Sequence, residues 1–297
     1  MRAWFLIRVN SRSFADKTLY ALLRLKNSCR FVSIGGLILR GFAALRLISV
    51  FPILTSLKIS IVIPAFNEER LIADTLHHIK AAAEVFPERG WDAEIIVCDN
   101  NSKDKTAQLA LAAGAKVVFE PINQIARARN RGAAEATGDW LIFVDADSKP
   151  SRELFMEVAD AIQAGECLAG GCVVRLDGDH NVANRLIGIW NFLSRWRCLL
   201  AGSFIFCETK VFREIGGFSN ELFAGEELDL SKRLKEVARA RKKRILILHQ
   251  HPLTTSPRKV ELYTLRQHIF FIAKAALLPG KTMRSRDACY IWYDGKR

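Results

Sequence analysis

From Lys58 onward, the sequence alternates between short apolar runs and longer amphipathic stretches. The runs "ISIVIP", "AEIIVCD", "AKVVFE" and "WLIFVDAD" are rich in apolar and β-branched residues, as is typical of buried parallel strands. The segments between them, 68–86, 104–114 and 124–138, place apolar residues at helical spacing. Strand and helix thus alternate four times, roughly every 20–25 residues, which predicts βαβ units. We therefore expect an α/β fold whose mostly parallel sheet is flanked by helices.

The same pattern continues in the second half of the chain. Residues 151–164, 180–200 and 226–239 predict helices, and the runs "CLAGGCVVRL", "GSFIFCE" and "RILILH" predict strands. Gly170 and Gly171 lie between strands and lack the Gly-x-Gly-x-x-Gly spacing after a first strand. A dinucleotide-binding Rossmann enzyme is therefore disfavoured.

The positive charge of the chain, +13, is concentrated at its two ends. Residues 1–58 hold ten basic residues and one acid, and residues 232–297 hold 17 basic and four acidic residues. The middle section, 59–231, holds 17 basic and 26 acidic residues, which argues against a nucleic-acid groove along the main domain. The basic ends favour an anionic surface such as phospholipid headgroups or a polyanionic substrate, although solvated side chains explain any single cluster equally well.

Both ends also contain apolar stretches. Residues 31–57 are long enough to span a bilayer, but Arg40 and Arg46 interrupt them, and a central arginine costs about 2.5–3.5 kcal/mol on insertion scales. For the N-terminal extension, 1–57, three interpretations stay open: an interfacial basic helix, which ranks first, a targeting segment, or sequence upstream of the true start. In the basic C-terminal tail, 253–297, a predicted amphipathic helix is too short to span a bilayer but suits its surface.

The chain has seven cysteines, an odd number, and no Cys-x-x-Cys pair. Several lie inside apolar runs, as in "EIIVCDN" and "GSFIFCE". This pattern favours buried free thiols in a reducing compartment over a disulfide framework or a zinc site.

Polar side chains follow three of the expected parallel strands. The segment "PAFNEE" follows the first strand, Asp99 ends the second, and Asp145 and Asp147 follow the strand that begins at Trp140. The carboxyl ends of parallel strands form the ligand-binding edge of such sheets. Because alternate strand residues face one side, Asp145 and Asp147 are placed to converge on one hard divalent cation. The competing interpretation is that Asp147 caps the next helix and Asp145 pairs with an arginine.

Four motifs occur in order and together resemble the family 2 glycosyltransferases of the GT-A fold. They are "SIVIPAFNEE" (60–69), "VCDNNSKDKT" (97–106), "ARARNRGAAEATGDWLIFVDADS" (126–148) and "GGFSNELFAGEELDLSKRL" (216–234). The resemblance covers roughly residues 58–250. It implies a glycosyltransferase domain over 58–252, with a nucleotide-binding half, 58–148, and an acceptor half, 149–252.

The resemblance implies that the loop after the first strand and the acid after the second hold the base and ribose of a nucleotide. These positions are Pro64, Ala65, Asn67, Glu68 and Asp99. A carboxylate such as Asp99 can accept a hydrogen bond from a uracil-like base edge. An Asx turn is the competing role for this side chain.

The family's Ala-Arg-Asn-x-Gly pattern matches Arg129, which implies a contact with the nucleotide or with Asp145. Asp145 and Ala146 are further implied donor contacts. Asp147 is then the implied ligand of a Mg²⁺ or Mn²⁺ ion on the donor diphosphate, where the metal would neutralise the leaving group.

Glu227 aligns with the family's usual aspartate base, so the implied base of an inverting transfer has one extra methylene here. Asp229 is the fallback base. The competing interpretation is that the acids are charges at a helix start, with Asp229 an i,i+4 partner of Arg233.

A late histidine often completes the metal shell in GT-A enzymes, which makes His249 and His251 candidate ligands. Surface or structural roles are the alternative. Arg258 is a candidate diphosphate contact, because arginine suits bidentate phosphate recognition. A turn around Pro257 with solvated charges explains this segment equally well.

These residues predict an enzyme that transfers one sugar, with inversion, from a nucleoside-diphosphate sugar. A cell-envelope saccharide or a lipid-linked molecule is the expected acceptor, at the cytoplasmic face of the membrane, with an anionic membrane surface as partner. A nucleotidyltransferase on a related fold and a catalytically silent membrane-associated homologue are the alternatives.

Overall fold

The computed structural model describes residues 4–9, 19–24, 56–178, 181–263 and 277–293, with shorter pieces at 266–267, 270–271 and 274. The chain forms two compact units, Met1–Leu54 and Thr55–Arg297. In the first unit, β1 (Trp4–Val9) pairs antiparallel with β2 (Leu19–Arg24), so the described part of the N-terminal extension forms strands rather than the expected helix. Of the apolar stretch 31–57, all but the last two residues lie outside the described residues.

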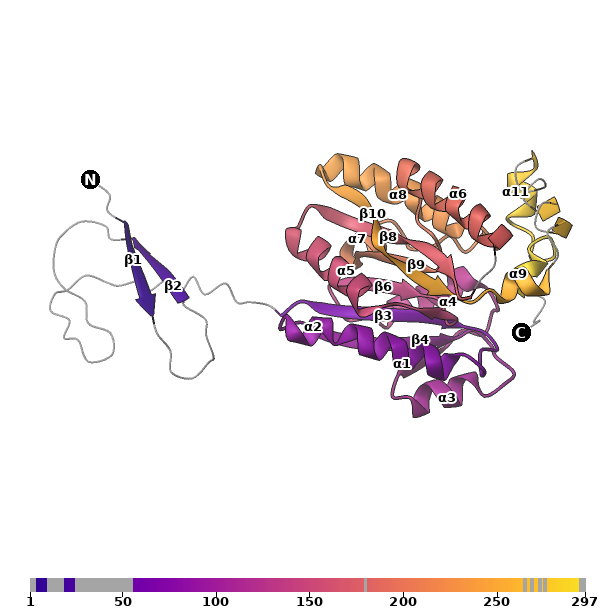
Figure 1. Cartoon of the computed structure of the whole chain (residues 1–297), viewed down its shortest axis with the longest axis horizontal. Helices are drawn as coiled ribbons and strands as arrows, with labels where there is room; N and C mark the ends of the chain where they lie inside the picture. The colour runs from indigo at the N-terminus through magenta and orange to yellow at the C-terminus, as the bar shows by residue number, and fades with distance from the viewer. Residues whose placement is uncertain are drawn as a thin grey trace. The chain divides into compact units, whose positions relative to one another are not determined.

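The second unit is built on an eight-stranded mixed sheet (Figure 1). Its first four strands in sheet order are parallel, as expected; β9 then runs antiparallel between β6 and β8, and β10 is parallel to β8. The short β7 pairs antiparallel with the end of β10. In sheet order the strands are β5 (Lys116–Phe119), β4 (Asp92–Asp99), β3 (Lys58–Ala65), β6 (Trp140–Val144), β9 (Phe204–Glu208), β8 (Cys167–Leu176), β10 (Arg244–Thr255) and β7 (Ser148–Lys149).

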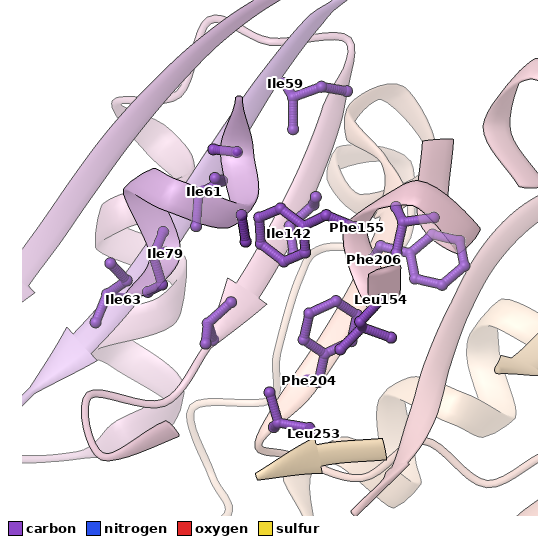
Figure 2. Packing of buried hydrophobic residues seen from close by; sticks show 14 of the residues in the cluster. Ile59, Ile61, Ile63, Ile79, Ile142, Leu154, Phe155, Phe204, Phe206 and Leu253 are labelled. Carbon is purple, nitrogen blue, oxygen red and sulfur yellow. The ribbon is translucent and has the colours of Figure 1, made fainter. Parts of the chain in front are cut away.

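Helices cover both faces of this sheet, which confirms the expected α/β class. Successive residues of β3 face opposite sides: Ile61 belongs to the core under α1 and α5, and Val62 to the core under α4, α7 and α8. Figure 2 shows the first core, in which Ile61 and Ile63 meet Ile79 of α1, and Phe155 of α5 lies nearby. The helices are α1 (Ile72–Ala83), α2 (Val85–Glu88), α3 (Thr106–Ala112), α4 (Ile125–Ala134), α5 (Arg152–Ala164), α6 (Asn181–Arg197), α7 (Thr209–Glu214), α8 (Glu226–Arg241), α9 (Arg258–Leu262), α11 (Pro279–Thr282) and α12 (Tyr290–Tyr293).

The last strand is longer than the sequence pattern predicts. β10 continues past "RILILH" to Thr255, and its pairing with β8 shifts between Leu248 and Leu253. Residues 249–252 therefore form a bulge, and the strand resumes beyond it. The expected domain boundary at 252 falls inside this strand, and residues 253–297 belong to the same compact unit as the sheet.

Helix α6 lies beside a part of β8 that β9 does not reach. The β8–β9 pairing ends at Gly171, opposite Ile205. The side-chain amide of Asn191 then replaces a neighbouring strand, because it accepts from the backbone N–H of Val174 and donates to its carbonyl, at 3.1 and 2.8 Å. A polar residue in the middle of α6 thus fixes this helix along the sheet edge.

The cysteines confirm the expectation of free thiols. The six that lie in the described residues are unpaired, and five of them are buried. Most of the predicted C-terminal helix around 265–278 lies outside the described residues, and no helix that the structure does describe is long and apolar enough to cross a membrane.

Gly170 is needed in β8 because the chains around it leave no room for a side chain. A Cβ at this position would lie 2.7 Å from the carbonyl oxygen of Leu246 and would overlap the buried ring of Phe206. We expect Gly170→Ala to lower the free energy of unfolding by about 1–3 kcal/mol, measured by chemical denaturation.

Gly188 of α6 is the matched control, since a Cβ there meets nothing within 4 Å. Gly188→Ala should raise stability by up to about 1 kcal/mol through helix propensity. Equal effects of the two substitutions would contradict the packing argument.

Candidate active site

The polar residues that follow β3, β4 and β6 meet at one edge of the sheet. Ala65 at the end of β3 pairs directly with Asp99 at the end of β4, and the backbone N–H of Asn100 donates to the carbonyl of Ala65 at 2.7 Å. Pro64, Ala65, Asn100 and Asp145 line one small cavity of about 60 Å³. Parallel pairing therefore brings three of the sequence motifs together, because their strands end at the same level.

Within this edge, Asn67 and Asp99 both bind the loop that follows β4. Asn67 takes a left-handed conformation (φ 51°), its N–H donates to Ser102 Oγ, and its side-chain oxygen accepts from Lys103 N–H at 2.8 Å. Asp99 Oδ1 accepts from Ser102 N–H at 3.1 Å, which is the local turn role that competes with base recognition. The adjacent Asn100, not Asp99, lines the cavity, so the sequence analysis missed it.

Asp145 and Asp147 pair with different arginines. They follow β6 in a turn, closed by a 3.1 Å hydrogen bond from Ser148 N–H to Asp145 O, and so do not share a strand face. Asp145 Oδ1 lies 2.9 Å from Arg129, and Asp147 Oδ2 lies 3.4 Å from Arg258. Because the strand ends at Val144, strand alternation does not place the two carboxylates on one face, which removes the reason given for expecting them to converge on one cation.

The structure also decides which side chain caps the following helix. Ser151, not Asp147, accepts from the N–H of Leu154 at the start of α5. The carboxylate of Asp147 is therefore not used as a cap, and it faces the cavities of the site.

Arg129 is the central cation of the site. Its side chain is 1% exposed, and its two terminal nitrogens donate to Glu226 Oε1 (2.7 Å), Asp145 Oδ1 (2.9 Å) and the carbonyl of Gly202 (2.7 Å). The face of the guanidinium lies 5.2 Å from the ring centre of Phe218. Burial would lower the pKa of Arg129, but the surrounding carboxylates raise it above its ordinary value, so the group stays charged.

Of the two contacts that the sequence offered for Arg129, the one with Asp145 is present. Arg129 comes from α4, Asp145 follows β6, and Glu226 begins α8, so one side chain joins three elements that are far apart in the sequence. The role of Glu226 was not predicted, because nothing in the local sequence distinguishes a glutamate that pairs with a buried arginine from a solvated charge at a helix start.

Arg258 links the first-strand loop to the Asp147 turn. Its guanidinium forms a two-pronged pair with Glu68, at 2.6 and 2.7 Å, in addition to the contact with Asp147. Ser256 N–H donates to the carbonyl of Asp147 at 3.1 Å, which holds the chain at the start of α9 beside that turn. Arg258 is therefore a half-buried, paired part of the site rather than the solvated charge of the alternative interpretation.

Glu227 and Asp147 open onto one cavity of about 260 Å³. Burial, and then the neighbouring Glu226, raise the pKa of Glu227 to about 8, while Arg129 lowers it in part. Asp229 instead pairs with Arg233 at 2.6 Å and does not line the cavity, as the helix-charge interpretation predicts. Glu226 also lines this cavity, but its carboxylate is paired with Arg129, so Glu227 is the better candidate base among the three acids at this helix start.

Aromatic residues of the C-terminal segment close the site. Trp292 of α12 lines both cavities, and Tyr293 lines the smaller one, where its hydroxyl accepts from Ile125 N–H at 3.3 Å. Burial raises the pKa of Tyr293, so its hydroxyl stays protonated. On sequence alone this segment is predicted as a basic tail; the aromatic cluster in "CYIWYD" (289–294) was the available signal for its place in the site.

Neither predicted histidine ligand reaches Asp147. His251 Nδ1 lies 2.5 Å from Glu157 Oε1 on α5, and His249 lies in the exposed part of the β10 bulge. Neither lines a cavity that contains Asp147. β10 continues past both histidines, and Arg258, at the start of α9, is the later side chain that contacts Asp147.

The residues present fit a divalent cation that is held largely by a substrate. Mg²⁺ typically takes one or two carboxylates and completes its shell with phosphate oxygens and water. Asp147 and Asp145 both line the cavities and supply such oxygens. Among the described residues, no group of three His, Cys, Asp or Glu side chains would hold an ion by itself. The site therefore suits a metal that binds together with a diphosphate.

The arrangement matches a known family. The sequence profile described as "Glycosyl transferase family 2" matches residues 60–215, which is more than half of the chain. The chain belongs to this family. The matched region begins in β3 and includes the ends of β3, β4 and β6, which form the edge of the cavity.

Curated relatives of this family 2 chain match over 35–39% of its length. It is 29% identical over 120 residues to a dolichol-phosphate mannosyltransferase from Pyrococcus furiosus, covering 39% of this chain and 33% of that protein. It is 36% identical over 112 residues to an undecaprenyl-phosphate 4-deoxy-4-formamido-L-arabinose transferase from Pseudomonas fluorescens, covering 35% and 32%. The matches thus span about a third of the length of these two relatives.

Solved structures share the GT-A fold with this chain. A Pyrobaculum calidifontis mannosyltransferase, in complex with GDP-Man and Mn²⁺, has a TM-score of 0.56 at 20% identity and covers 74% of this chain and 61% of its own. S. aureus TarS, in complex with UDP-GlcNAc, has a TM-score of 0.55 at 17% identity, with coverage of 80% and 71%. Glucosyl-3-phosphoglycerate synthase from Mycobacterium tuberculosis, with Mn²⁺ and UDP, has a TM-score of 0.53 at 19% identity and covers 78% of each chain.

The buried position of Arg129 leads to a stability prediction. Arg129→Met removes one partner of a buried pair and leaves Glu226 without its cation, so we expect the free energy of unfolding to fall by about 3–5 kcal/mol. Chemical denaturation measures this loss. Arg129→Met combined with Glu226→Gln should recover part of it.

Arg131, also on α4, provides the matched control. It forms an exposed i,i+4 pair with Glu135, so Arg131→Met should cost less than about 1 kcal/mol. Similar losses for the two arginine variants would show that Arg129 does not hold the site together.

Proposed function

We propose that this chain transfers a single sugar, with inversion, from a nucleoside-diphosphate sugar to a cell-envelope saccharide or a lipid-linked acceptor. One observation carries the proposal: the Asp147 carboxylate and the Glu227 carboxylate face the same cavity. Donor activation and acceptor deprotonation require two such groups on either side of one reaction centre.

The donor would lie along the strand-end edge. Pro64, Ala65 and Asn100 form the wall for the base and ribose, and Asp145, Ala146 and Asp147 lie where a diphosphate would follow. Arg258 is within reach of the same space and supplies positive charge for the diphosphate once it exchanges Glu68 and Asp147 for phosphate oxygens. UDP is the favoured nucleotide, in keeping with the UDP complexes of two of the structural neighbours.

A Mg²⁺ or Mn²⁺ ion held by Asp147, with Asp145 beside it, would stabilise the negative charge of the leaving diphosphate. Mn²⁺ in two of the neighbouring structures supports this assignment. Arg129 neutralises Asp145 and Glu226 and thereby fixes the turn from which Asp147 extends.

Glu227 would act as the base. As the acceptor hydroxyl attacks the anomeric carbon, its proton moves to the Glu227 carboxylate and the bond from that carbon to the diphosphate breaks. Attack from the face opposite the leaving group inverts the anomeric configuration. The raised pKa of Glu227 makes it a stronger proton acceptor near neutral pH than an ordinary carboxylate.

The proposed class of acceptor is supported by the names of two relatives and by the net positive charge of the chain. Two curated relatives are named for transfer to dolichol phosphate or undecaprenyl phosphate, and the chain carries a net charge of +13. A lipid-linked acceptor would place the enzyme peripherally at the inner face of the cell membrane.

The two rival functions differ in what they require. A nucleotidyltransferase would use the two aspartates on a nucleoside triphosphate and would leave Glu227 without a role. A silent homologue would bind no nucleotide. Calorimetric titration with UDP, GDP and dTDP in the presence of Mn²⁺, together with a pyrophosphate-release assay, distinguishes the three. Nucleotide binding without pyrophosphate release is the result expected here.

Glu227→Gln should lower the rate of transfer by about 10²–10⁴-fold, because the amide cannot accept the acceptor proton. In the unaltered protein, kcat/KM should rise with pH through about 8, since the Glu227 carboxylate is the active form and its pKa is raised. The residual rate of Glu227→Gln should lack this rise. Full activity in Glu227→Gln with a large loss in Asp229→Asn would move the base to Asp229.

Asp147→Ala should abolish metal-dependent hydrolysis of the donor while leaving the circular dichroism spectrum and the unfolding midpoint close to those of the parent. The carboxylate is replaced at a turn whose backbone hydrogen bonds remain. Asp177→Ala, at an exposed carboxylate that pairs with Lys149, is the control. Undiminished Mn²⁺-dependent hydrolysis in Asp147→Ala would refute the metal assignment.

A further inference from the structure

Helix α6 is apolar on two opposite sides. One side packs on the sheet: Ile187 and Trp190 contact the core, and Ser194 is 1% exposed. The other side carries five large apolar side chains in the solvent, at the spacing i, i+3, i+6, i+7 and i+10, so they form one stripe along the helix. This outer face consists of Leu186 (51% exposed), Ile189 (59%), Phe192 (68%), Leu193 (38%) and Trp196 (67%).

The helix that carries the apolar stripe also carries arginines and no acidic residues. Arg185, Arg195 and Arg197 are exposed on the same helix, and the sequence from Asn181 to Leu200 contains no aspartate or glutamate. A helix that pairs exposed tryptophan, phenylalanine and leucine with arginines has the composition of one that lies in a membrane interface. Water is a poor environment for such a face, because contiguous exposed apolar surface of this kind is uncommon on soluble proteins.

A basic cavity adjoins the same face. It has a volume of about 740 Å³, and Leu193, Trp196 and Arg197 form part of its wall. The remaining charges in its lining are Lys235 and Arg239 of α8 and Lys243, which follows that helix. No residue of this cavity lines the two cavities of the active site.

The cations of this basic cavity are held in place. Arg197 lies over the ring of Trp196, at 4.8 Å from its centre. Lys235 donates to the carbonyl of Arg197 at 2.5 Å, and Lys243 donates to the carbonyl of Gly165. Lysines and arginines fixed around a hollow beside an apolar stripe match the geometry of an anionic headgroup whose acyl chains lie next to the stripe.

We propose that the outer face of α6 and the adjoining basic cavity form a docking surface for an anionic phospholipid membrane. The apolar side chains enter the headgroup–acyl boundary, and the cavity cations bind lipid phosphates. Self-association through this face is the weaker explanation, because it would bring the arginines of two copies together without an acid on the helix to pair with them.

The surface is joined to the active site by a short connection. Gly202, whose carbonyl accepts from Arg129, follows Arg197 at the end of α6 by five positions. Five extended residues span at most about 18 Å, so a membrane-seated α6 would hold the reaction cavity near the lipid headgroups. In this respect the inference rests on the proposed function, which calls for a lipid-linked acceptor; membrane binding itself requires neither donor nor acceptor.

The test is co-sedimentation of the full chain with vesicles. We expect it to bind vesicles of equal parts phosphatidylglycerol and phosphatidylcholine, and to be released by high salt because the charge contribution is screened. Phe192→Glu combined with Trp196→Glu should weaken this binding at least about tenfold, since two anchors become charges that an anionic surface repels. Arg195→Gln combined with Arg197→Gln should weaken binding to these vesicles and leave the weak binding to pure phosphatidylcholine unchanged.

Leu111→Glu is the matched control, because Leu111 is a 66% exposed apolar residue on α3, away from α6. It should bind as the parent does. Donor hydrolysis in vesicle-free solution should be unaffected in every variant, so a failure of the proposed enzyme activity would be seen separately.

Three results would overturn the inference. The first is no vesicle binding by the parent chain. The second is binding that Phe192→Glu with Trp196→Glu leaves unchanged, which would assign membrane contact to the basic ends. The third is a parent chain that is dimeric by light scattering and becomes monomeric in that variant, which would make the face an interface between two copies.

Discussion

The site depends on one buried cation, Arg129. Its side chain binds three segments that are far apart in the sequence. Its guanidinium holds the turn after β6, the carbonyl before β9 and the first residue of α8. A buried charge is costly to desolvate, and a hydrophobic replacement of all partners often stabilises a protein. Its contribution here is one of position: it fixes where Asp147 and Glu227 stand relative to each other.

A second arginine controls the charge on the other side of the same cavity. Arg258 neutralises Glu68 and Asp147, so the acidic strand ends do not repel one another in the absence of a ligand. It comes from the start of α9, after the last strand, which places the C-terminal segment at the donor edge. The aromatic residues Trp292 and Tyr293 close that edge further. The C-terminal residues therefore belong to the site.

One stretch of chain, from α6 to Gly202, links the proposed docking surface to the candidate active site. Asn191 ties α6 to the free edge of β8, which turns the opposite side of the helix outward. The chain then passes from Arg197 to Gly202 and enters the Arg129 network. The same short segment connects an apolar, cationic surface to the reaction cavity, so a membrane-bound acceptor and a water-soluble donor would approach from different sides of the same domain.

The sequence by itself determined the α/β class, the parallel strand ends and the motif residues. Hydrophobic periodicity is local, and short β-branched runs such as "ISIVIP" and "WLIFVDAD", in alternation with helical segments, indicate strands without knowledge of the tertiary structure. Glu227 could be selected by its motif, but its difference from Asp229 could not be derived, because both acids occupy the first turn of one helix. The tertiary structure separates them: Glu227 lines the cavity that also contains Asp147, whereas Asp229 does not and keeps its local pair with Arg233.

Only the tertiary structure decided which cation each aspartate meets. Asp145 and Asp147 are two residues apart, yet Arg129 precedes them by 16 residues or more and Arg258 follows them by 111 or more. His249 and His251 lie away from Asp147 for the same reason: the bulge at 249–252 and the continuation of β10 to Thr255 depend on pairing with β8 and β7. Periodicity specifies which face of its own helix or strand a side chain occupies. The partners of that side chain depend on how distant elements pack. In this protein, sheet register and one buried arginine decide that packing around the site.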